Sequence, residues 1–468
     1  MNLFNTTSTD AGAGVFSRGR SGDRVYLLEQ VFVVMSLLYF GSAAFVFFAA
    51  GGSDVEGVGL ICRQAGFLLI YGVSALLLLR DWRAAVRLVA GEKFIAAVVL
   101  LALGSVVWSV APRVTAVRSF ALFGSFLFGL YFVSRFDMRR RIELLAFAGG
   151  IAALLAVCFS WAAPDLGVMQ QGPLVQGAWR GSTPHKNMLG RTMVVGGGSF
   201  LITAVYFGRR HFLYGGGMFL CLAVLIFTLS KGSLLAMIGF LLAAAVLFCI
   251  LRHALLVPCL LAMILAVTGL WGVLRVHESG AREHVKRVEL WEEIENQLND
   301  GDFSEPGARR QAVLSMLQRH ARSARPGTSE AREDRAASGF ALPTVRGRFK
   351  LWSVTLDACR KRPLLGYGYS AFWPRNRVKA AKAGNLGWLA PHSHNGYLEL
   401  WLDMGAVGVV LVGASLATAV FRLWKQMGPV DEWGEMLAPG FLFMCVAGLN
   451  VWAHFLVAHN SLDRKSVV

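Results

Sequence analysis

Long apolar runs constrain the fold of this 468-residue chain more than any other feature. A transmembrane helix needs roughly 20 apolar residues, and a helix satisfies its own backbone hydrogen bonds in lipid. The mean hydropathy of +0.52 is too high for a soluble protein of this size. The sequence therefore predicts an all-α polytopic membrane protein with 11–12 transmembrane helices. The runs lie near residues 25–50, 58–79, 94–111, 114–133, 142–163, 188–207, 212–229, 233–251, 254–275, 395–421 and 435–459.

The distribution of lysine and arginine between these runs predicts the orientation of the chain. With the N-terminus inside, the inner segments hold sixteen of these residues and the short outer loops hold four. Cytoplasmic loops carry such an excess. We therefore expect a cytoplasmic tail over 1–24, a first bundle of about nine helices over 25–275, a large outer loop over 276–393 and C-terminal transmembrane helices over 394–468. In a bacterium this means the inner (cytoplasmic) membrane, with the large loop in the periplasm.

The charge balance and the cysteines exclude several classes of function. The net charge of +17 follows from the positive-inside bias and from attraction to anionic membrane lipids, so it does not indicate nucleic acid as a partner. Six of the seven cysteines lie in apolar runs, and Cys359 stands alone in the large loop. This spacing indicates neither a disulfide framework nor a paired-cysteine metal site.

The large outer loop divides into two parts by composition. Residues 276–340 are polar and rich in Arg, Glu and Ala, whereas residues 344–393 are denser in Trp, Tyr, Gly and Arg. The second part predicts a helix that begins near Gly347 and runs to about Cys359, before Pro363. A tight turn is expected from Pro363 to Tyr369.

Basic residues and histidines gather in four segments that this topology places on the outer side, namely 179–187, 230–233, 344–348 and 392–395. Cations at outer helix ends oppose the positive-inside tendency. A pocket for an anionic lipid headgroup such as a diphosphate explains them, because arginine forks match phosphate oxygens and lysine supplies a point charge. Anchoring by snorkelling side chains is favoured for any one residue alone, but four segments together favour the pocket. The candidate binding residues are Arg180, His185, Lys186, Lys231, Arg346 and Arg348, with Asn187 in support.

Two histidines stand where the large loop meets the tenth apolar run, in the string Pro391-His392-Ser393-His394-Asn395. An imidazole at the membrane surface can accept a proton near neutral pH and act as a general base. We predict that His394 is the catalytic base, supported by Asn395, Glu399 and His392. His392 is the rival base, and His394 with Asn395 could instead cap the helix.

No metal or other cofactor is expected at this outer cluster. None of its four segments contains an aspartate or glutamate, and divalent ions such as magnesium prefer carboxylate ligands. The charge of a departing diphosphate would then be stabilised by arginine and lysine directly.

Five short strings occur in a fixed order along the chain, and together they resemble the O-antigen ligase and polymerase family of bacterial envelope glycosyltransferases. The resemblance covers roughly residues 95–425. Lys231 departs from the arginine that this family often has there, which keeps the charge but loses bidentate geometry. The strings are Trp108-Ser109 before Pro112; His185-Lys186-Asn187 before Gly190; Ser230-Lys231-Gly232; Gly347-Arg348 and Trp352 before Pro363-Leu364, Gly366 and Gly368; and His394-Asn395 with Tyr397-Leu398-Glu399 before Gly405 and Gly408.

The resemblance implies a fold related to the GT-C type and a lipid-linked donor. The donor would be undecaprenyl diphosphate carrying an O-antigen polysaccharide, and the acceptor in the ligase branch would be lipid A–core oligosaccharide. By the same resemblance, His394 would be the base of a metal-independent inverting transfer. Arg348 and Lys231 would hold the diphosphate.

Three alternatives remain open from the sequence. A polymerase would pass the same donor glycan to a growing glycan, and a protein O-oligosaccharyltransferase would pass it to a protein hydroxyl. A transporter of lipid-linked glycans would perform no chemistry, but it should carry ionisable residues near the bilayer midplane and symmetric halves. Most candidates here lie at the outer rim, which disfavours the transporter.

Overall fold

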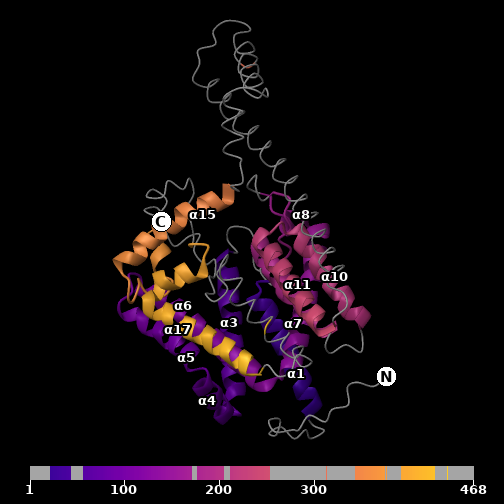
Figure 1. Ribbon diagram of the computed structural model, residues 1–468, viewed down its shortest axis with the longest axis horizontal. Coiled ribbons are helices and arrows are strands. Elements are labelled where there is room, and N and C mark those ends of the chain that lie inside the picture. The colour runs from indigo at the N-terminus through magenta and orange to yellow at the C-terminus, as the bar shows by residue number, and fades with distance from the viewer. Residues whose placement is uncertain are drawn as a thin grey trace.

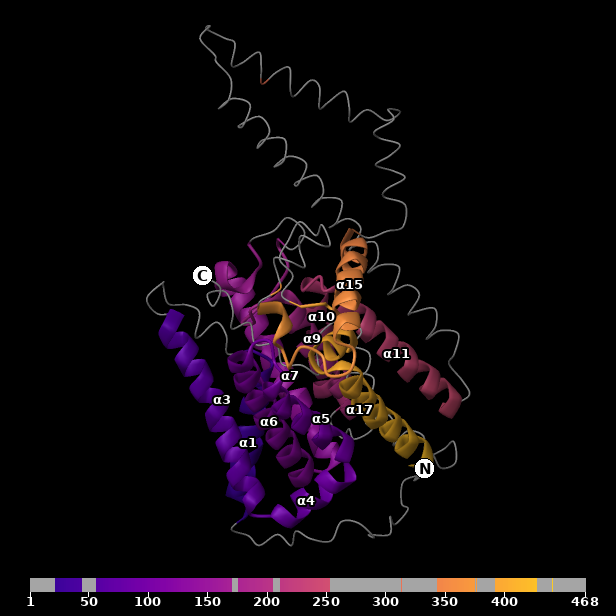
Figure 2. The ribbon, with the colours of Figure 1, turned by 90° about the vertical axis from the view of Figure 1, so that its left-hand side faces the viewer.

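The computed structural model describes residues 22–43, 56–170, 176–204, 211–252, 343–374 and 392–426, with the isolated residues 313, 376 and 440. These residues form a bundle of helices in which α15 lies at one end and α4 at the other (Figures 1 and 2). The helices are α1 (Gly22–Phe40), α3 (Glu56–Leu79), α4 (Trp82–Gly91), α5 (Lys93–Gly104), α6 (Pro112–Arg135), α7 (Met138–Ala162), α8 (Pro164–Gly167), α9 (Lys186–Ile202), α10 (His211–Phe227), α11 (Lys231–Arg252), α15 (Pro343–Lys361) and α17 (Gly396–Gln426), with a 3-10 turn at Ser105–Val107.

The protein is an all-α, multi-pass membrane protein, as the sequence predicts. Four helices in the described residues, α3, α6, α7 and α17, are long and apolar enough to cross a membrane. A helix also lies on each of the first eight predicted runs. The predicted run 254–275, the run 435–459 except for residue 440, and most of the predicted loop 276–393 lie outside the described residues. Within that loop, α15 confirms the predicted helix and ends just before Pro363.

Helix α9 packs between α7, α10 and α11, and small residues let it approach α7 closely. A Cβ added at Gly149 of α7 would lie 2.4 Å from the Cα of Gly196 in α9, so the two backbones touch. Helix backbones come this near only where both positions lack a side chain. This contact fixes α9, whose first turn brings the predicted residues His185, Lys186 and Asn187 to one end of the bundle.

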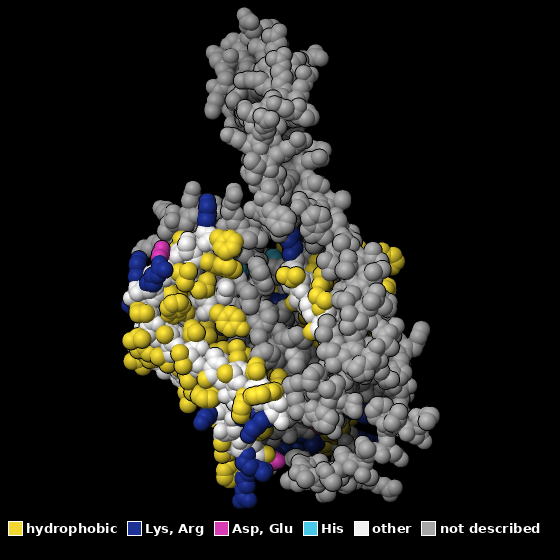
Figure 3. All heavy atoms as spheres, in the orientation of Figure 1, with side chains coloured by type: hydrophobic (Ala, Val, Ile, Leu, Met, Phe, Trp, Pro, Cys, Tyr) yellow, Lys and Arg dark blue, Asp and Glu magenta, His cyan; other side chains and the backbone are white. Residues whose placement is uncertain are grey.

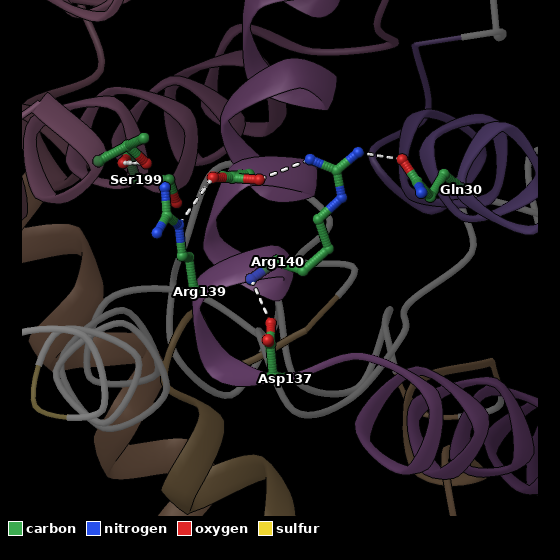
Figure 4. A network of polar contacts seen from close by, with 7 residues as sticks. Gln30, Asp137, Arg139, Arg140 and Ser199 are labelled. Atoms are coloured by element: carbon green, nitrogen blue, oxygen red, sulfur yellow. Dashed lines mark hydrogen bonds and ion pairs between the residues drawn. The ribbon is translucent and has the colours of Figure 1, made fainter. Parts of the chain in front are cut away.

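The basic residues at the start of α7 are paired with partners on α7 and α1 (Figure 4). The Asp137 carboxylate caps the helix by accepting a hydrogen bond from the Arg140 backbone N–H at 2.8 Å. The Arg140 side chain donates to Gln30 of α1 and forms an ion pair with Glu143. These contacts join α1 to α7 at the end of the bundle that the charge bias assigns to the inner side.

An amphipathic helix connects α3 to α5, where the sequence reading placed only a basic connection over residues 80–93. Helix α4 begins after Asp81, whose carboxylate accepts a hydrogen bond from the Ala84 N–H at 3.3 Å. Ten residues are too few to span a bilayer. Arg422, near the end of α17, forms an ion pair with Glu92 and donates to the Gly91 carbonyl at 2.6 Å. The predicted inner segments around residues 80–93 and 422–425 therefore meet at one end.

Helix α17 is broken at Gly405, whereas the sequence reading treated 395–421 as one uninterrupted span. Gly405 has φ 67° and ψ −168°, a conformation that only glycine adopts readily. The break separates a short first part, Gly396–Met404, from a longer second part (Figure 1). The predicted turn 363–369 fills the break, and its backbone pairs with the groups that the break leaves outside the helix. Those hydrogen bonds are Ala406 N–Pro363 O (2.8 Å), Val407 N–Leu364 O (3.3 Å), Tyr367 N–Leu402 O (2.9 Å) and Gly368 N–Asp403 O (3.0 Å).

Candidate functional site

The segment 392–395 forms a hydrogen-bonded turn directly before α17. The Asn395 carboxamide oxygen caps the helix by accepting from the backbone N–H groups of Tyr397 at 3.0 Å and Leu398 at 3.2 Å. The capping role that the sequence suggested for Asn395 is thus confirmed. His394 itself has φ 55°, a left-handed conformation that is uncommon for a residue other than glycine. Its side chain is half-buried.

His392 contacts His394 directly. The His394 backbone N–H donates to His392 Nδ1 at 3.1 Å, and the two ring centroids are 4.1 Å apart. Because Nδ1 of His392 accepts this bond, the neutral ring carries its proton on Nε2. His392 therefore shapes the backbone at His394.

Trp352 of α15 connects the large loop to this segment. Its indole Nε1 donates to the backbone carbonyl of Ser393 at 2.9 Å. Trp352 stands one helical turn after Arg348, so the backbone of Arg348 lies in the same helix that contacts the histidine segment. The side chains of Arg346 and Arg348 lie outside the described part of the structure, and their roles stay predictions.

A second group of the predicted residues comes together where α9 and α11 begin. Ser230 Oγ donates to the Asn187 carboxamide oxygen at 3.1 Å, and the Lys186 ammonium donates to the Leu229 carbonyl at 3.4 Å. A Cβ added at Gly190 would lie 2.8 Å from Ser233 Oγ, so the glycine permits this approach. The two predicted segments 179–187 and 230–233 are thus neighbours.

Two lysines of this group act on each other electrostatically. Lys186 is buried, and Lys231 is the first residue of α11. Burial, followed by the charge of Lys231, lowers the pKa of Lys186 from its ordinary value to about 8. A pair of ammonium groups held together at the start of a helix stabilises a bound anion, because the helix N-terminus adds positive potential.

His185 and Arg180 have structural partners in this group. His185 caps α9, since its Nδ1 accepts from the Asn187 backbone N–H at 3.1 Å. Burial, followed by the charges of Lys186, Arg191 and Arg180, lowers the pKa of His185 to about 4, so it is neutral at pH 7 and adds no positive charge. Arg180 donates to the carbonyls of Leu166 at 2.7 Å and Asp165 at 3.2 Å. Its guanidinium therefore holds the turn that contains α8.

The lowered pKa of Lys186 predicts a pH dependence of anion binding. Lys186 is protonated below its pKa of about 8 and loses its charge above it, so the dissociation constant of a diphosphate lipid should rise as the pH increases through 8, by at most about tenfold per pH unit. Lys186→Arg keeps its charge at every accessible pH and should bind with little change between pH 7 and 9.5. Donor binding by microscale thermophoresis checks this. A wild-type dissociation constant that does not change with pH, or one that rises equally in Lys186→Arg, would contradict the prediction.

The structure joins two of the four predicted segments directly, and it joins a third to the helix that contains the fourth, segment 344–348. Segments 179–187 and 230–233 meet at the start of α9 and α11, and segment 392–395 meets α15. In the space-filling view, histidine and basic side chains are visible between the described surface of α15 and α17 and that of α11 (Figure 3). Convergence of all four segments on one pocket stays a prediction.

Three buried ionisable side chains lie beneath the histidine segment, and the sequence reading missed two of them. Glu399 and Asp403, in the first part of α17, are 1% and 0% exposed. Arg118 of α6 is buried as well; its Nη1 donates to the Ser370 carbonyl at 3.4 Å, and its charge acts on both carboxylates. Asp403 and Arg118 stand inside predicted spans, where ionisable residues usually mark function. Their position within apolar runs is visible in the sequence, so both residues could have been predicted from it.

Residues 216–413 match the family model described as O-antigen ligase. The predicted resemblance to the O-antigen ligase family is confirmed. The matched segment includes Lys231, Arg348 and His394, and it is shorter than the predicted 95–425.

A curated relative adds a second likeness. Over 93 residues the chain is 29% identical to the exopolysaccharide production protein ExoQ of Rhizobium meliloti (strain 1021). This stretch covers 19% of the chain and 21% of that relative. The likeness is therefore confined to about a fifth of either protein.

Proposed function

We propose that the protein transfers O-antigen polysaccharide from undecaprenyl diphosphate to lipid A–core oligosaccharide, on the periplasmic side of the inner membrane. The observation that carries this proposal is the match of residues 216–413 to the O-antigen ligase family, a segment that contains His394. A lipid-linked donor suits a multi-pass membrane protein, because its lipid part stays in the bilayer while its glycan reaches the surface.

The residues support a direct displacement. Neutral His394 accepts the proton of the acceptor hydroxyl while that oxygen forms a bond to the anomeric carbon. The bond from the anomeric carbon to the phosphate oxygen breaks, and its electron pair leaves with undecaprenyl diphosphate. Lys231, together with Arg348, stabilises the charge that develops on this leaving group. Attack opposite the leaving group inverts the anomeric configuration, and no metal is needed.

The roles of Lys231 and Arg348 predict large losses on substitution. Lys231→Ala and Arg348→Ala should each lower turnover on the order of a hundredfold, as expected when one electrostatic donor is removed. Lys231→Arg keeps the charge and should lose less. Initial rates of undecaprenyl diphosphate release by purified variants, at matched protein folding, measure this. Near wild-type rates in both alanine variants would leave these cations with anchoring roles.

Reconstitution with purified substrates tests the function itself. Donor lipid and lipid A–core, supplied together with excess EDTA, should yield modified lipid A–core and free undecaprenyl diphosphate. Longer glycans formed from donor alone would instead identify a polymerase. Glycan found on a protein acceptor would identify an oligosaccharyltransferase. Activity lost in EDTA and restored by magnesium would exclude the metal-independent mechanism.

The orientation is tested separately by labelling. A cysteine introduced at Ser323 of the large loop should react with a membrane-impermeant reagent in intact spheroplasts, whereas one introduced at Arg139 should be protected. The reverse pattern would overturn the sidedness that the charge bias predicts.

A further inference from the structure

Ser393, next to the proposed base, is held by every polar group that it carries. It is 0% exposed. Its backbone N–H donates to Glu399 Oε2 at 3.0 Å, and its carbonyl accepts from Trp352 Nε1 at 2.9 Å. Its hydroxyl donates to the Asn395 carbonyl at 2.8 Å. Ser393 is therefore a fixed point between α15 and α17.

His394 occupies the one position between two such fixed residues. Ser393 precedes it, and Asn395, the cap of α17, follows it. Its left-handed φ of 55° is unfavourable for histidine, so the conformation persists only where the neighbours determine it. The direction of the imidazole follows from this backbone conformation. Whatever holds Ser393 therefore sets the position of the His394 ring.

Glu399 provides this hold from inside the helix. It lies one turn into α17, is 1% exposed, and its carboxylate reaches back to the Ser393 N–H. The arrangement resembles a capping box, in which an acidic residue in the first turn accepts from a backbone N–H outside the helix. Trp373 lies against the same carboxylate, and the charge of Arg118 acts on it, so its position is itself constrained.

We propose that Glu399 is a positioning residue: through Ser393 it holds His394 in the left-handed conformation that aims the imidazole at the acceptor hydroxyl. This inference rests on the proposed function. It assigns Glu399 neither a bond to substrate nor a proton transfer. Its contribution is geometric, and small displacements of a catalytic group are costly to rate.

The comparison of two substitutions at Glu399 tests the proposal. Glu399→Ala removes the acceptor for the Ser393 N–H and should lower kcat on the order of tenfold, the loss expected for one hydrogen bond to a carboxylate, with the donor dissociation constant unchanged. Glu399→Gln keeps an oxygen that can accept this bond and should retain most of the wild-type kcat. Glu143→Ala, which removes a paired carboxylate at the opposite end of the bundle, is the matched control and should leave kcat unchanged. The assay follows undecaprenyl diphosphate release from donor lipid and lipid A–core.

A second variant makes the test independent of folding at position 399. Trp352→Phe removes the donor to the Ser393 carbonyl and keeps an aromatic ring, so it should lower kcat in the same sense with donor binding intact. Equal losses in Glu399→Ala and Glu399→Gln would overturn the proposal, because the charge and not the hydrogen bond would then matter. Wild-type kcat in Glu399→Ala, or a loss confined to donor binding, would overturn it as well.

His394→Ala in the same assay separates the two levels of inference. An inactive His394→Ala beside a fully active Glu399→Ala would refute the positioning role and leave the proposed function intact. An active His394→Ala would refute the base, and the positioning role with it. Absence of product with every protein, wild type included, would refute the proposed substrates.

Discussion

Replacing His394 with alanine is expected to abolish glycan transfer while donor binding persists. Among the residues of segment 392–395, His394 combines a base of suitable chemistry with a half-buried side chain and a fixed backbone. Alanine removes the base and leaves the cations that would bind the diphosphate untouched. The measurement pairs a gel-shift assay for modified lipid A–core with the dissociation constant of the donor lipid.

His392→Ala is the matched comparison, and it should keep substantial activity. Its Nδ1 accepts the His394 backbone N–H at 3.1 Å, so its loss should loosen the segment without removing the base. A single hydrogen bond of this kind is worth about 1 kcal/mol, which corresponds to less than about tenfold in rate. Robust transfer by His394→Ala, or product with retained anomeric configuration, would refute the mechanism.

The fold was predictable from the sequence wherever apolar length alone decides it. The helices α6 and α7 follow the predicted runs closely, because a bilayer leaves few choices for a run of such length. The break in α17 was not predictable in the same way, because hydropathy continues across Gly405. The glycines of segment 363–369 predict a turn. That this turn pairs with the break in α17 is known only from the backbone hydrogen bonds between the two segments.

The candidate site was predicted in its residue types more than in their roles. Lys186 and Lys231 are neighbours, and Asn395 caps α17, as the spacing indicated. His185 was grouped with the cations, but burial beside three basic residues keeps it neutral. Arg118 and Asp403 were not among the predicted residues, because they lie within apolar runs and away from the basic segments at the rim. Burial and long-range charge contacts depend on packing, which the order of residues does not reveal.

The largest structural effect is expected from Gly405→Ala, which should prevent correct folding of the site. The left-handed φ at this position costs a side-chain-bearing residue about 1–3 kcal/mol. In addition, the new Cβ would lie 2.0 Å from the Leu364 carbonyl oxygen, a distance at which the backbone of turn 363–369 must move. That movement breaks the hydrogen bonds by which the turn satisfies the interrupted helix, and unsatisfied backbone groups cost about 1–3 kcal/mol each.

Gly413→Ala is the control, because it lies in the same helix and a Cβ there meets nothing within 4 Å. Alanine favours helix over glycine by about 1 kcal/mol, so this variant should be as stable as the wild type or slightly more so.

Fluorescence-detected size-exclusion chromatography and the midpoint of thermal unfolding in detergent compare the two variants with the wild type. We expect Gly405→Ala to aggregate or to unfold at a much lower temperature, with loss of transfer. A normal midpoint in Gly405→Ala would mean that α17 can run straight, and that the turn 363–369 does not depend on the break. The first part of α17 carries Glu399 and follows directly from His394, so the geometry of the proposed base depends on this one glycine.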